Sequence, residues 1–408
     1  MRRFAQDWEG SHLRLMFNNV RRRREWFTEN ASPRQVANAG LALAQFGLKA
    51  RVLRAWPVLV KIDISPLCNL RCTYCVHARP SSPADKLLTL QSFKAADKMT
   101  VGQFDRVVRE IGGKSMAVSL YYVGDPLVHP DLAEMCGLAS EARLNSHVST
   151  NFSFKLSDDK LAGLVSSGLT HLTICVDGMT QESYERTRVG GRLDLVLDNL
   201  RRVLEIRREI GSTRPKIEVQ FIKFQHNIAE LAEVERWATR HGVDQFTAYW
   251  GNLHNYVDLA QGNYRVFGPK EKKQVPLCTW PYFSMQIKYN GDVIPCCYHR
   301  HDQQFIPGGD SRVVGNVFDS SVWDVWNSPE YRLIRRLVAD PQRVLKEPEL
   351  GGTFCEGCPT VFTTDADSRT VRAQDQTWES LYSIDRRGIV RRRNAVVRET
   401  EAAGADPG

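Results

Sequence analysis

From residue 58 onward, short segments rich in β-branched and aromatic residues alternate with longer segments of helical periodicity. Between these short segments apolar residues recur every three to four positions, and Thr100, Ser157 and Asn227 stand where helix caps are expected. Successive strand and helix units predict an α/β fold with a parallel sheet and right-handed crossovers. Six units favour a partial (β/α)6 TIM-like barrel, whose chemistry gathers where the strands end. The six expected strands are 58–65, 116–123, 146–150, 171–176, 216–224 and 245–250.

Composition divides the 408 residues into four segments. We expect a basic helical segment at 1–56, the barrel at 57–261, a small cysteine-rich domain at 262–360 that opens with a linker at 262–277, and a largely irregular tail at 361–408. No apolar run approaches the roughly 18 to 20 residues of a transmembrane segment. The N-terminus also lacks the apolar core of a signal peptide, so a cytoplasmic protein is expected.

Positive charge is concentrated near the two ends of the chain. Residues 1–56 contain 11 Lys/Arg against 4 Asp/Glu, and six arginines lie between 386 and 398. A block such as 21–24, which is four arginines, can bind nucleic acid, an anionic membrane surface or an acidic partner. No aromatic-rich module for reading bases accompanies this charge. We therefore expect a solvated helix face here and no nucleic-acid partner.

Three of the ten cysteines lie directly after the first expected strand. Cys68, Cys72 and Cys75 have the spacing C-x3-C-x2-C. In a reducing compartment such clustering indicates metal binding or catalysis rather than disulfides. A structural zinc ion would need a fourth ligand close by. Iron–sulfur clusters usually take four thiolates, so a loop with three leaves one iron open to an outside ligand.

This loop, placed after the first strand of a βα barrel, resembles the signature of the radical S-adenosylmethionine (SAM) enzymes. The resemblance implies that SAM chelates the open iron of a [4Fe–4S] cluster through its amino and carboxylate groups. It also implies that an electron from the cluster cleaves SAM to a 5′-deoxyadenosyl radical, which abstracts a substrate hydrogen. A reducing partner such as flavodoxin or ferredoxin is then expected.

Further segments resemble the SAM-binding motifs of this family in the same order. The sequence Gly-Asp-Pro at 124–126 resembles a Gly-Glu-Pro motif at the SAM amino group, and Ser-Thr-Asn at 149–151 resembles a segment near the ribose, with Phe152 where Gly is usual. Arg188 is a candidate for a bidentate contact with the SAM carboxylate. The resemblance implies that SAM contacts Tyr74, Gly124, Asp125, Pro126, Ser149, Asn151, Asp177, Arg188 and Asn227.

A second group of cysteines follows the barrel. Cys278 leads through C-x12-G-x4-C to Cys296, and "CEGC" supplies Cys355 and Cys358. The pattern resembles the SPASM/twitch extension of radical SAM enzymes, which carries auxiliary iron–sulfur clusters. A full SPASM domain needs seven or eight thiolates for two clusters, whereas these four complete one auxiliary [4Fe–4S] cluster. A zinc ribbon on the same four cysteines is the alternative. Cys297, directly after Cys296, is left over, and the nearby His299 and His301 are expected to be solvated.

An auxiliary cluster that protein thiolates ligate completely can accept an electron but cannot bind substrate. The resemblance therefore favours a radical SAM oxidoreductase that oxidises a C–H or alcohol carbon of a small sugar-like or aminocyclitol metabolite. A radical epimerase is an alternative, with Cys297 or Cys175 as hydrogen donor. Cys175 shares a strand face with Asp177, although it can equally be a small buried side chain.

Two further alternatives remain. Many SPASM enzymes modify peptides and carry an N-terminal winged-helix module, but residues 1–56 show no β-hairpin signal. A non-catalytic iron–sulfur scaffold or redox sensor would have no use for the SAM-binding motifs.

Overall fold

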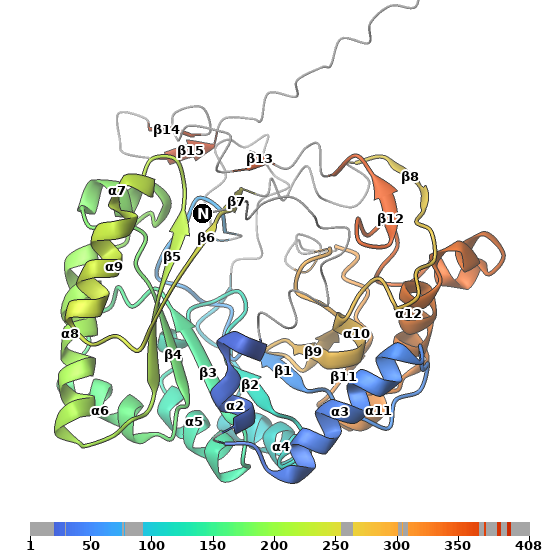
Figure 1. The fold of residues 1–408 in the computed structure, drawn as a ribbon, viewed down its shortest axis with the longest axis horizontal. Helices are drawn as coiled ribbons and strands as arrows, with labels where there is room; N and C mark the ends of the chain where they lie inside the picture. The colour runs from blue at the N-terminus through green and yellow to red at the C-terminus, as the bar shows by residue number, and fades with distance from the viewer. Residues whose placement is uncertain are drawn as a thin grey trace, which may run out of the picture.

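The computed structural model describes residues 20–28, 30–75, 77, 93–253, 264–300, 304, 309–366, 371–372, 382–384 and 390–392. A nine-stranded sheet with the order β11-β10-β9-β1-β2-β3-β4-β5-β6 organises this part of the chain (Figure 1). Strands β1 to β6 are parallel and neighbours in sequence order, which confirms the partial-barrel prediction. They are β1 (Leu59–Ile62), β2 (Ala117–Ser119), β3 (Asn145–Thr150), β4 (His171–Cys175), β5 (Lys216–Lys223) and β6 (Gln245–Trp250).

Helices in the crossovers cover the outer face of the sheet (Figure 1). Thr100 and Ser157 cap α4 and α6 as predicted, since their hydroxyls accept hydrogen bonds from the Gln103 and Lys160 amides at 3.2 and 3.3 Å; such caps contribute about 1 kcal/mol each. The elements are α4 (Val101–Ile111), η3 (Pro126–Val128), α5 (Leu132–Glu141), α6 (Asp158–Ser166), α7 (Gln181–Thr187), α8 (Leu193–Glu209), η4 (Ile228–Glu230) and α9 (Leu231–Arg240).

The two faces of the sheet differ in chemistry because side chains alternate along each strand. One set is apolar and buried against the helices, and full burial of such a side chain contributes about 1.5 to 3 kcal/mol; it includes Val60, Ile62, Val118, Val148, Leu172, Ile174, Ile217 and Val219. The alternate positions form the inner face of the barrel and are polar, including Lys61, Ser119, His147, Thr173, Glu218 and Thr247. The barrel interior therefore suits polar groups.

The C-terminal cysteine-rich segment continues this sheet. Strand β9 (Ser284–Ile287) pairs in parallel with β1, and β10 (Asp292–Ile294) and β11 (Gly315–Asn316) follow antiparallel. Beside them lie α10 (Trp280–Phe283), α11 (Val322–Trp326), α12 (Pro329–Ala339), η6 (Pro341–Leu345) and η7 (Pro348–Leu350). The boundary expected at residue 262 therefore separates two stretches of sequence whose strands share one sheet.

The expected linker and tail contain short strands. Strand β8 (Val266–Pro269), within the expected linker, pairs with β12 (Phe362–Thr364). In the segment predicted to be irregular, β13 (Val371–Arg372) pairs with β7 (Asn252–Leu253), and β14 (Tyr382–Ile384) pairs with β15 (Val390–Arg392). Among the described residues, no helix has the length and apolar character needed to cross a membrane.

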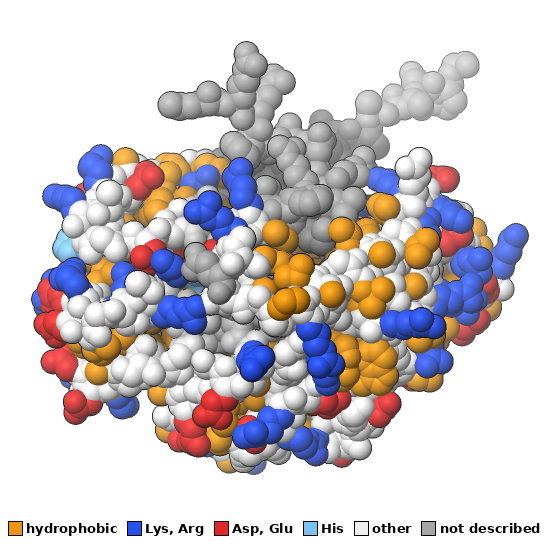
Figure 2. All heavy atoms as spheres, turned by 60° about the horizontal axis from the view of Figure 1, so that its bottom comes forward, with side chains coloured by type: hydrophobic (Ala, Val, Ile, Leu, Met, Phe, Trp, Pro, Cys, Tyr) orange, Lys and Arg blue, Asp and Glu red, His pale blue; other side chains and the backbone are white. Residues whose placement is uncertain are grey.

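The described part of the N-terminal segment contains two helices and packs on both parts of the sheet. Helix α3 (Pro33–Gly47) places Phe46 against Tyr282 of α10, with ring centroids 5.2 Å apart. The fully buried Arg335 of α12 donates hydrogen bonds to the carbonyls of Arg51 and Pro281 at 3.1 and 2.9 Å. Figure 2 shows basic, acidic and hydrophobic side chains interspersed over the face that it displays.

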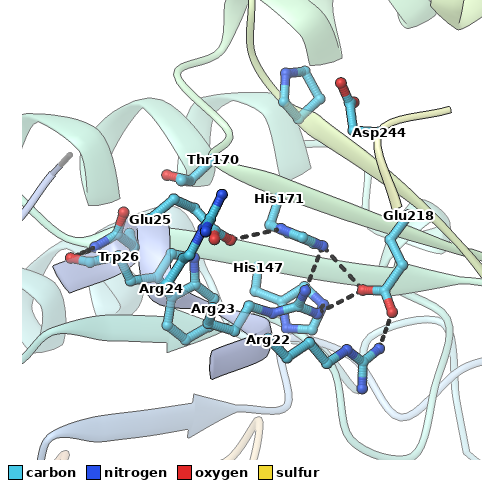
Figure 3. Close-up of polar contacts among 12 residues, drawn as sticks. Arg22, Arg23, Arg24, Glu25, Trp26, His147, Thr170, His171, Glu218 and Asp244 are labelled. Atoms are coloured by element: carbon cyan, nitrogen blue, oxygen red, sulfur yellow. Dashed lines mark hydrogen bonds and ion pairs between the residues drawn. The ribbon is translucent and has the colours of Figure 1, made fainter. Parts of the chain in front are cut away.

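The arginine block at 21–24 does not form the solvated helix face that the sequence predicted. Arg21 and Arg24 are exposed, but Arg22 and Arg23 point to the inner face of the barrel, where both pair with Glu218 (Figure 3). The Arg23 Nη2 to Glu218 Oε2 distance is 2.8 Å, and their side chains are 8% and 0% exposed. The prediction failed because the partner of this block lies almost two hundred residues away in sequence.

Candidate active site

The three-cysteine loop follows β1 and is fixed by its backbone. The amides of Arg71 and Thr73 donate to the carbonyls of Val189 and Thr187, both at 3.0 Å. On the other side, the chain after β2 passes so close that a Cβ on Gly124 would lie 2.1 Å from the carbonyl oxygen of Ser65. Glycine is therefore required at this position, which supports the matched Gly-Asp-Pro motif.

Asp125 connects the ends of β2 and β3 to this loop. Its amide donates to the Leu67 carbonyl at 2.8 Å. Its carboxylate accepts hydrogen bonds from the Thr150 hydroxyl at 2.9 Å and from the Asn151 amide at 2.7 Å. Burial raises the pKa of Asp125 to about 6, although the hydrogen bond from Asn151 opposes that shift. Asp125, which stands where the family motif has the longer Glu, thus positions the cysteine loop through its own backbone amide and through its carboxylate contacts with Thr150 and Asn151.

Asn151 reaches the cysteine loop directly. Its Nδ2 donates to Asn69 Oδ1 at 2.9 Å and lies 3.9 Å from Cys68 Sγ. Ser149, two residues earlier on the inner face of β3, is the register partner of Thr173 on β4. Pro126 is buried at the first position of η3. The matched residues of β2 and β3 therefore lie around one edge of the cysteine loop.

A buried ion pair lies at the opposite edge, where β4 ends. Arg188 Nε donates to Asp177 Oδ2 at 2.7 Å, and both side chains are almost fully buried. Tyr74 Oη is 3.5 Å from the same carboxylate oxygen, and the Arg188 guanidinium lies 5.6 Å from the centre of the Tyr74 ring. Tyr74, Asp177 and Arg188 are therefore one contiguous group beside the cysteines.

Asn227 stands at the predicted N-cap position, at the start of η4, but its side chain is used elsewhere. It makes no capping hydrogen bond to η4. Its Nδ2 donates to the carbonyls of Asp177 and Ile222 at 2.8 and 3.0 Å, and its Oδ1 accepts from the Phe224 amide at 2.7 Å. Both amide hydrogens are thus used to join the ends of β4 and β5, which makes Asn227 a positioning residue in this structure.

The three thiols are crowded and largely removed from water. Burial raises the pKa of Cys72 to about 12, with Cys75 adding to the shift and Arg188 opposing it. Burial and the nearby Asp125 also raise the pKa of Cys68. Thiols in this setting ionise only when positive charge compensates them, as iron does in a cluster. Three such thiols beside a glycine-dependent loop fit a cluster with one iron left for SAM.

The second cysteine group is assembled from three loops. Cys278 precedes α10, Cys296 follows β10, and Cys355 and Cys358 lie after η7. Burial raises the pKa of all four thiols, and Cys358 raises the pKa of the other three, which places the four near one another. Among the described residues, no three His, Cys, Asp or Glu side chains converge at the distances of a single-ion site.

His299 and Arg300 hold these loops together. The His299 Nε2 is 2.9 Å from the Glu356 carbonyl oxygen, and Arg300 Nε donates to the Phe354 carbonyl at 2.9 Å. His299 is 7% exposed, and burial lowers its pKa to about 4. The prediction of a solvated His299 is therefore wrong, because it links the two cysteine loops; His301 lies outside the described residues.

Two buried hydroxyls support an iron–sulfur group at the second cysteine set. Tyr282 and Tyr331 have buried hydroxyl oxygens without a hydrogen-bond partner. Burial raises the pKa of both hydroxyls, and the nearby thiols add to the shift, Cys278 at Tyr282 and Cys296 and Cys355 at Tyr331, while Arg335 opposes it. Hydrogen-bond donors to sulfur are a usual feature of cluster sites. The donor set and its surroundings therefore fit an auxiliary cluster.

The two candidate hydrogen donors both reach the inner face. Cys175 Sγ lies 3.8 Å from Gln220 Oε1, and Cys175 is 7% exposed. Cys297 Sγ lies 3.6 Å from the Lys61 ammonium of β1. Lys61 was not identified from the sequence. Polar and apolar residues alternate in "VKID" at 60–63, and this alternation could have marked a polar site on the inner face.

Comparison with known proteins agrees with this arrangement. Residues 62–214 match the model of the radical SAM superfamily, and residues 278–359 match that of SPASM, an iron–sulfur cluster-binding domain. The chain belongs to the radical SAM superfamily. Within it, the chain carries a C-terminal SPASM domain. Its cofactors are therefore SAM, the SAM-binding [4Fe–4S] cluster and auxiliary iron–sulfur clusters.

Relatives of the chain are distant but extend over most of its length. The tungsten-containing aldehyde ferredoxin oxidoreductase cofactor-modifying protein of Pyrococcus furiosus is 23% identical over 337 residues, which covers 75% of this chain and 90% of that protein. The PqqA peptide cyclase of Gluconobacter oxydans is 23% identical over 337 residues and covers 74% and 86%. The crystal structure of Streptococcus suis SuiB superposes with a TM-score of 0.51 at 16% identity, covering 80% and 79%, and shows the shared fold.

Proposed function

We propose that the protein is a radical SAM oxidoreductase that oxidises a C–H or alcohol carbon of a small, sugar-like metabolite. The observation that carries this proposal is the separation of two thiol sets: three thiols on the loop after β1, and four more that gather around the β9 and β10 segment. When bound, SAM and its cluster supply a 5′-deoxyadenosyl radical, and the auxiliary cluster supplies an acceptor for one electron. The substrate then loses one hydrogen atom, one proton and one electron, so an alcohol becomes a ketone.

The chain's own residues have distinct tasks in this proposal. Cys68, Cys72 and Cys75 hold the SAM-binding cluster, and Arg188 and Asp177 orient SAM at its edge. The four later cysteines, Cys278, Cys296, Cys355 and Cys358, enclose the auxiliary cluster. The polar inner face binds the substrate, with the Tyr249 hydroxyl and Gln220 Oε1 2.7 Å apart above Cys175. Such hydrogen-bonding groups suit hydroxylated substrates.

Peptide modification is supported less well. PqqA peptide cyclase is named for a peptide substrate. In this chain, however, the described N-terminal segment is engaged with the barrel through Arg22 and Arg23 and with α10 through Phe46. It is therefore not a separate recognition module, which favours a small-molecule substrate.

Iron content and SAM cleavage test the proposal. After anaerobic reconstitution we expect about eight irons per chain, and 5′-deoxyadenosine when SAM and dithionite are added. The triple variant C68A/C72A/C75A should keep about half of the iron and lose SAM cleavage. The variant C136A is a matched control, because Cys136 lies buried in α5, away from both sets. SAM cleavage by the triple variant would contradict the assignment.

Radical epimerisation is a second candidate because Cys175 lies on the inner face, beside Gln220. A thiol there would return a hydrogen atom to the opposite side of the substrate carbon. Turnover in D2O distinguishes the reactions: an epimerase fixes solvent deuterium on that carbon, and Cys175→Ala abolishes the incorporation. An oxidoreductase gives a product oxidised by two electrons that lacks this deuterium.

A further inference from the structure

Lys61 lies between the two cysteine sets on the inner face of the sheet. It is the third residue of β1, and Cys68, the first cysteine of the three-cysteine loop, follows seven positions later. Its register partner on one side is Ser119 of β2, and on the other side Gln286 of β9. Lys61 therefore lies on β1, the strand at which the barrel strands meet the strands of the auxiliary domain. Figure 1 shows β1 between β2 and β9.

Aromatic rings from both sides surround the Lys61 ammonium. The Tyr121 and Tyr122 ring centres are 5.3 and 6.0 Å away, and these residues follow β2 just before the Gly-Asp-Pro segment. The Trp280 ring centre is 5.9 Å away, and Trp280 begins α10 two residues after Cys278. Aromatic faces at about 6 Å stabilise a cation that has lost part of its water. The ammonium thus faces the space between the two expected clusters.

No carboxylate in the described part of the chain contacts the Lys61 ammonium directly. Among the described residues, no Asp or Glu oxygen lies within 4 Å of the Lys61 ammonium, and its closest polar contact is Cys297 Sγ at 3.6 Å. Asp63, two residues along β1, instead accepts the Val123 amide at 3.5 Å. The charge of Asp63 still favours the Lys61 ammonium from beyond that distance, but the ammonium keeps no direct carboxylate contact among the described residues, so an anion from outside can bind to it.

We propose that Lys61 binds an anionic oxygen group of the substrate, a carboxylate or a phosphate, in this cage of Tyr121, Tyr122 and Trp280. The inference rests on the proposed function, because it takes the space between the clusters as the substrate site. It narrows that function to acidic or phosphorylated sugar-like substrates and disfavours cationic aminocyclitols. Lys61 is then a specificity-determining residue rather than a group that exchanges protons with the substrate.

Charge-selective alkylation of Cys297 tests this proposal without turnover. Reconstituted holoenzyme is treated with iodoacetate or with neutral iodoacetamide, and modification of Cys297 is followed by mass spectrometry. Any change in the reactivity of the thiol itself affects both reagents. The rate with iodoacetate divided by the rate with iodoacetamide therefore reports the local preference for an anion. We expect this ratio in the wild type to exceed that in Lys61→Met by about fivefold or more, as for unit charges about 4 Å apart in water.

Two variants separate charge from folding. Lys61→Arg keeps the charge and should keep most of the ratio. Lys114→Met is the matched control, because Lys114 also lies over an aromatic ring, 3.9 Å from the centre of Trp56, but on the outer helix α4 side. Inorganic phosphate and malonate, added separately at equal ionic strength, identify the preferred group by which of them slows carboxymethylation more.

Several results would overturn the proposal. An equal ratio in wild type and Lys61→Met would show that the ammonium does not select anions, and a Cys297 that resists both reagents would show that it is not a free thiol beside Lys61. Neither result depends on SAM cleavage. Failure of the proposed function would appear separately, as holoenzyme that forms no 5′-deoxyadenosine.

Discussion

Gly124 shows how a single residue determines the geometry of the cysteine loop. The nearest atoms to a Cβ at this position are backbone atoms of 65–67, which cannot rotate away as a flexible side chain would. The loop and the segment after β2 therefore pack backbone against backbone. This contact fixes the position of the first cysteine relative to Asp125 and Asn151.

Replacement of Gly124 by Ala should consequently disrupt the loop. We expect a loss of about 1 to 3 kcal/mol of stability, the usual cost of overpacking, and reduced iron at the three-cysteine site. The midpoint of urea unfolding and iron content measure the two effects. Gly102→Ala in α4 is the control, because nothing lies within 4 Å of its Cβ position and its stability should not fall. Equal behaviour of the two variants would refute the close-packing argument.

Sequence identified the residues whose chemistry is local and missed those defined by distant partners. The cysteines were found because their spacing is short and thiolate chemistry is specific. The Arg23 contact with Glu218 and the Lys61 contact with Cys297 join residues far apart in the chain, so no local pattern records them. The solvation expected for His299 failed for the same reason, since its partner is the backbone at Glu356.

At the scale of elements, the short helix α2 (Arg24–Thr28) and the residues before it lie against the inner face of the barrel, where Arg23 contacts β4 and β5. A five-residue helix is not stable alone, so its position depends on tertiary contacts. Those contacts are concentrated on Glu218, which pairs with Arg22 and Arg23 while His171 Nε2 lies 3.0 Å from it (Figure 3). The N-terminal segment is thus anchored by charge rather than by an apolar face alone.

Removal of one member of this ion-pair group should be costly. Arg23→Met leaves the buried Glu218 carboxylate with only Arg22 as a cationic partner. We expect a loss of roughly 3 kcal/mol, near the low end for an uncompensated buried charge because Arg22 remains. Arg24→Met, at an exposed position of the same helix, should change stability by less than about 0.5 kcal/mol. Urea midpoints that fall equally in both variants would contradict this account.

The same cluster predicts a dependence of stability on pH. Burial, with Arg23 adding to it, lowers the pKa of His147 well below its usual range. Below about pH 6.5 the unfolded chain binds a proton that the folded protein excludes, so stability falls as pH decreases from 7.5 to 5.5. At the acidic end of that range, His147 lowers the free energy of unfolding by about 1.4 kcal/mol for each pH unit.

The variant His147→Gln isolates that contribution. Its stability, measured by urea unfolding at each pH, should fall less steeply over the same window than that of the wild type. Glu218 does not titrate within this pH window. Burial alone would raise its pKa, but the His171 contact and the two arginines hold that pKa below the usual range. The stability that Glu218 contributes is present above about pH 4.5 and is lost only below it. Parallel pH profiles would contradict the assigned role of His147.

At the scale of the whole molecule, one sheet carries both cysteine sets. The three-cysteine loop follows β1, and Cys278 and Cys296 flank the β9 and β10 hairpin, whose first strand pairs directly with β1. Strand pairing therefore fixes the two sites relative to each other. The sequence predicted the six parallel strands from their periodicity, but the parallel β1 and β9 pairing joins segments more than two hundred residues apart and had no local signal.

The central claim is that the first site has an open iron and the second does not. Electron paramagnetic resonance of the reduced clusters tests it, using C278A/C296A to leave the first cluster and C68A/C72A/C75A to leave the second. Addition of SAM should change the spectrum of the first cluster, because SAM becomes its fourth ligand, and should leave that of the second unchanged. A spectrum that responds to SAM only when the second cluster is present would contradict the account.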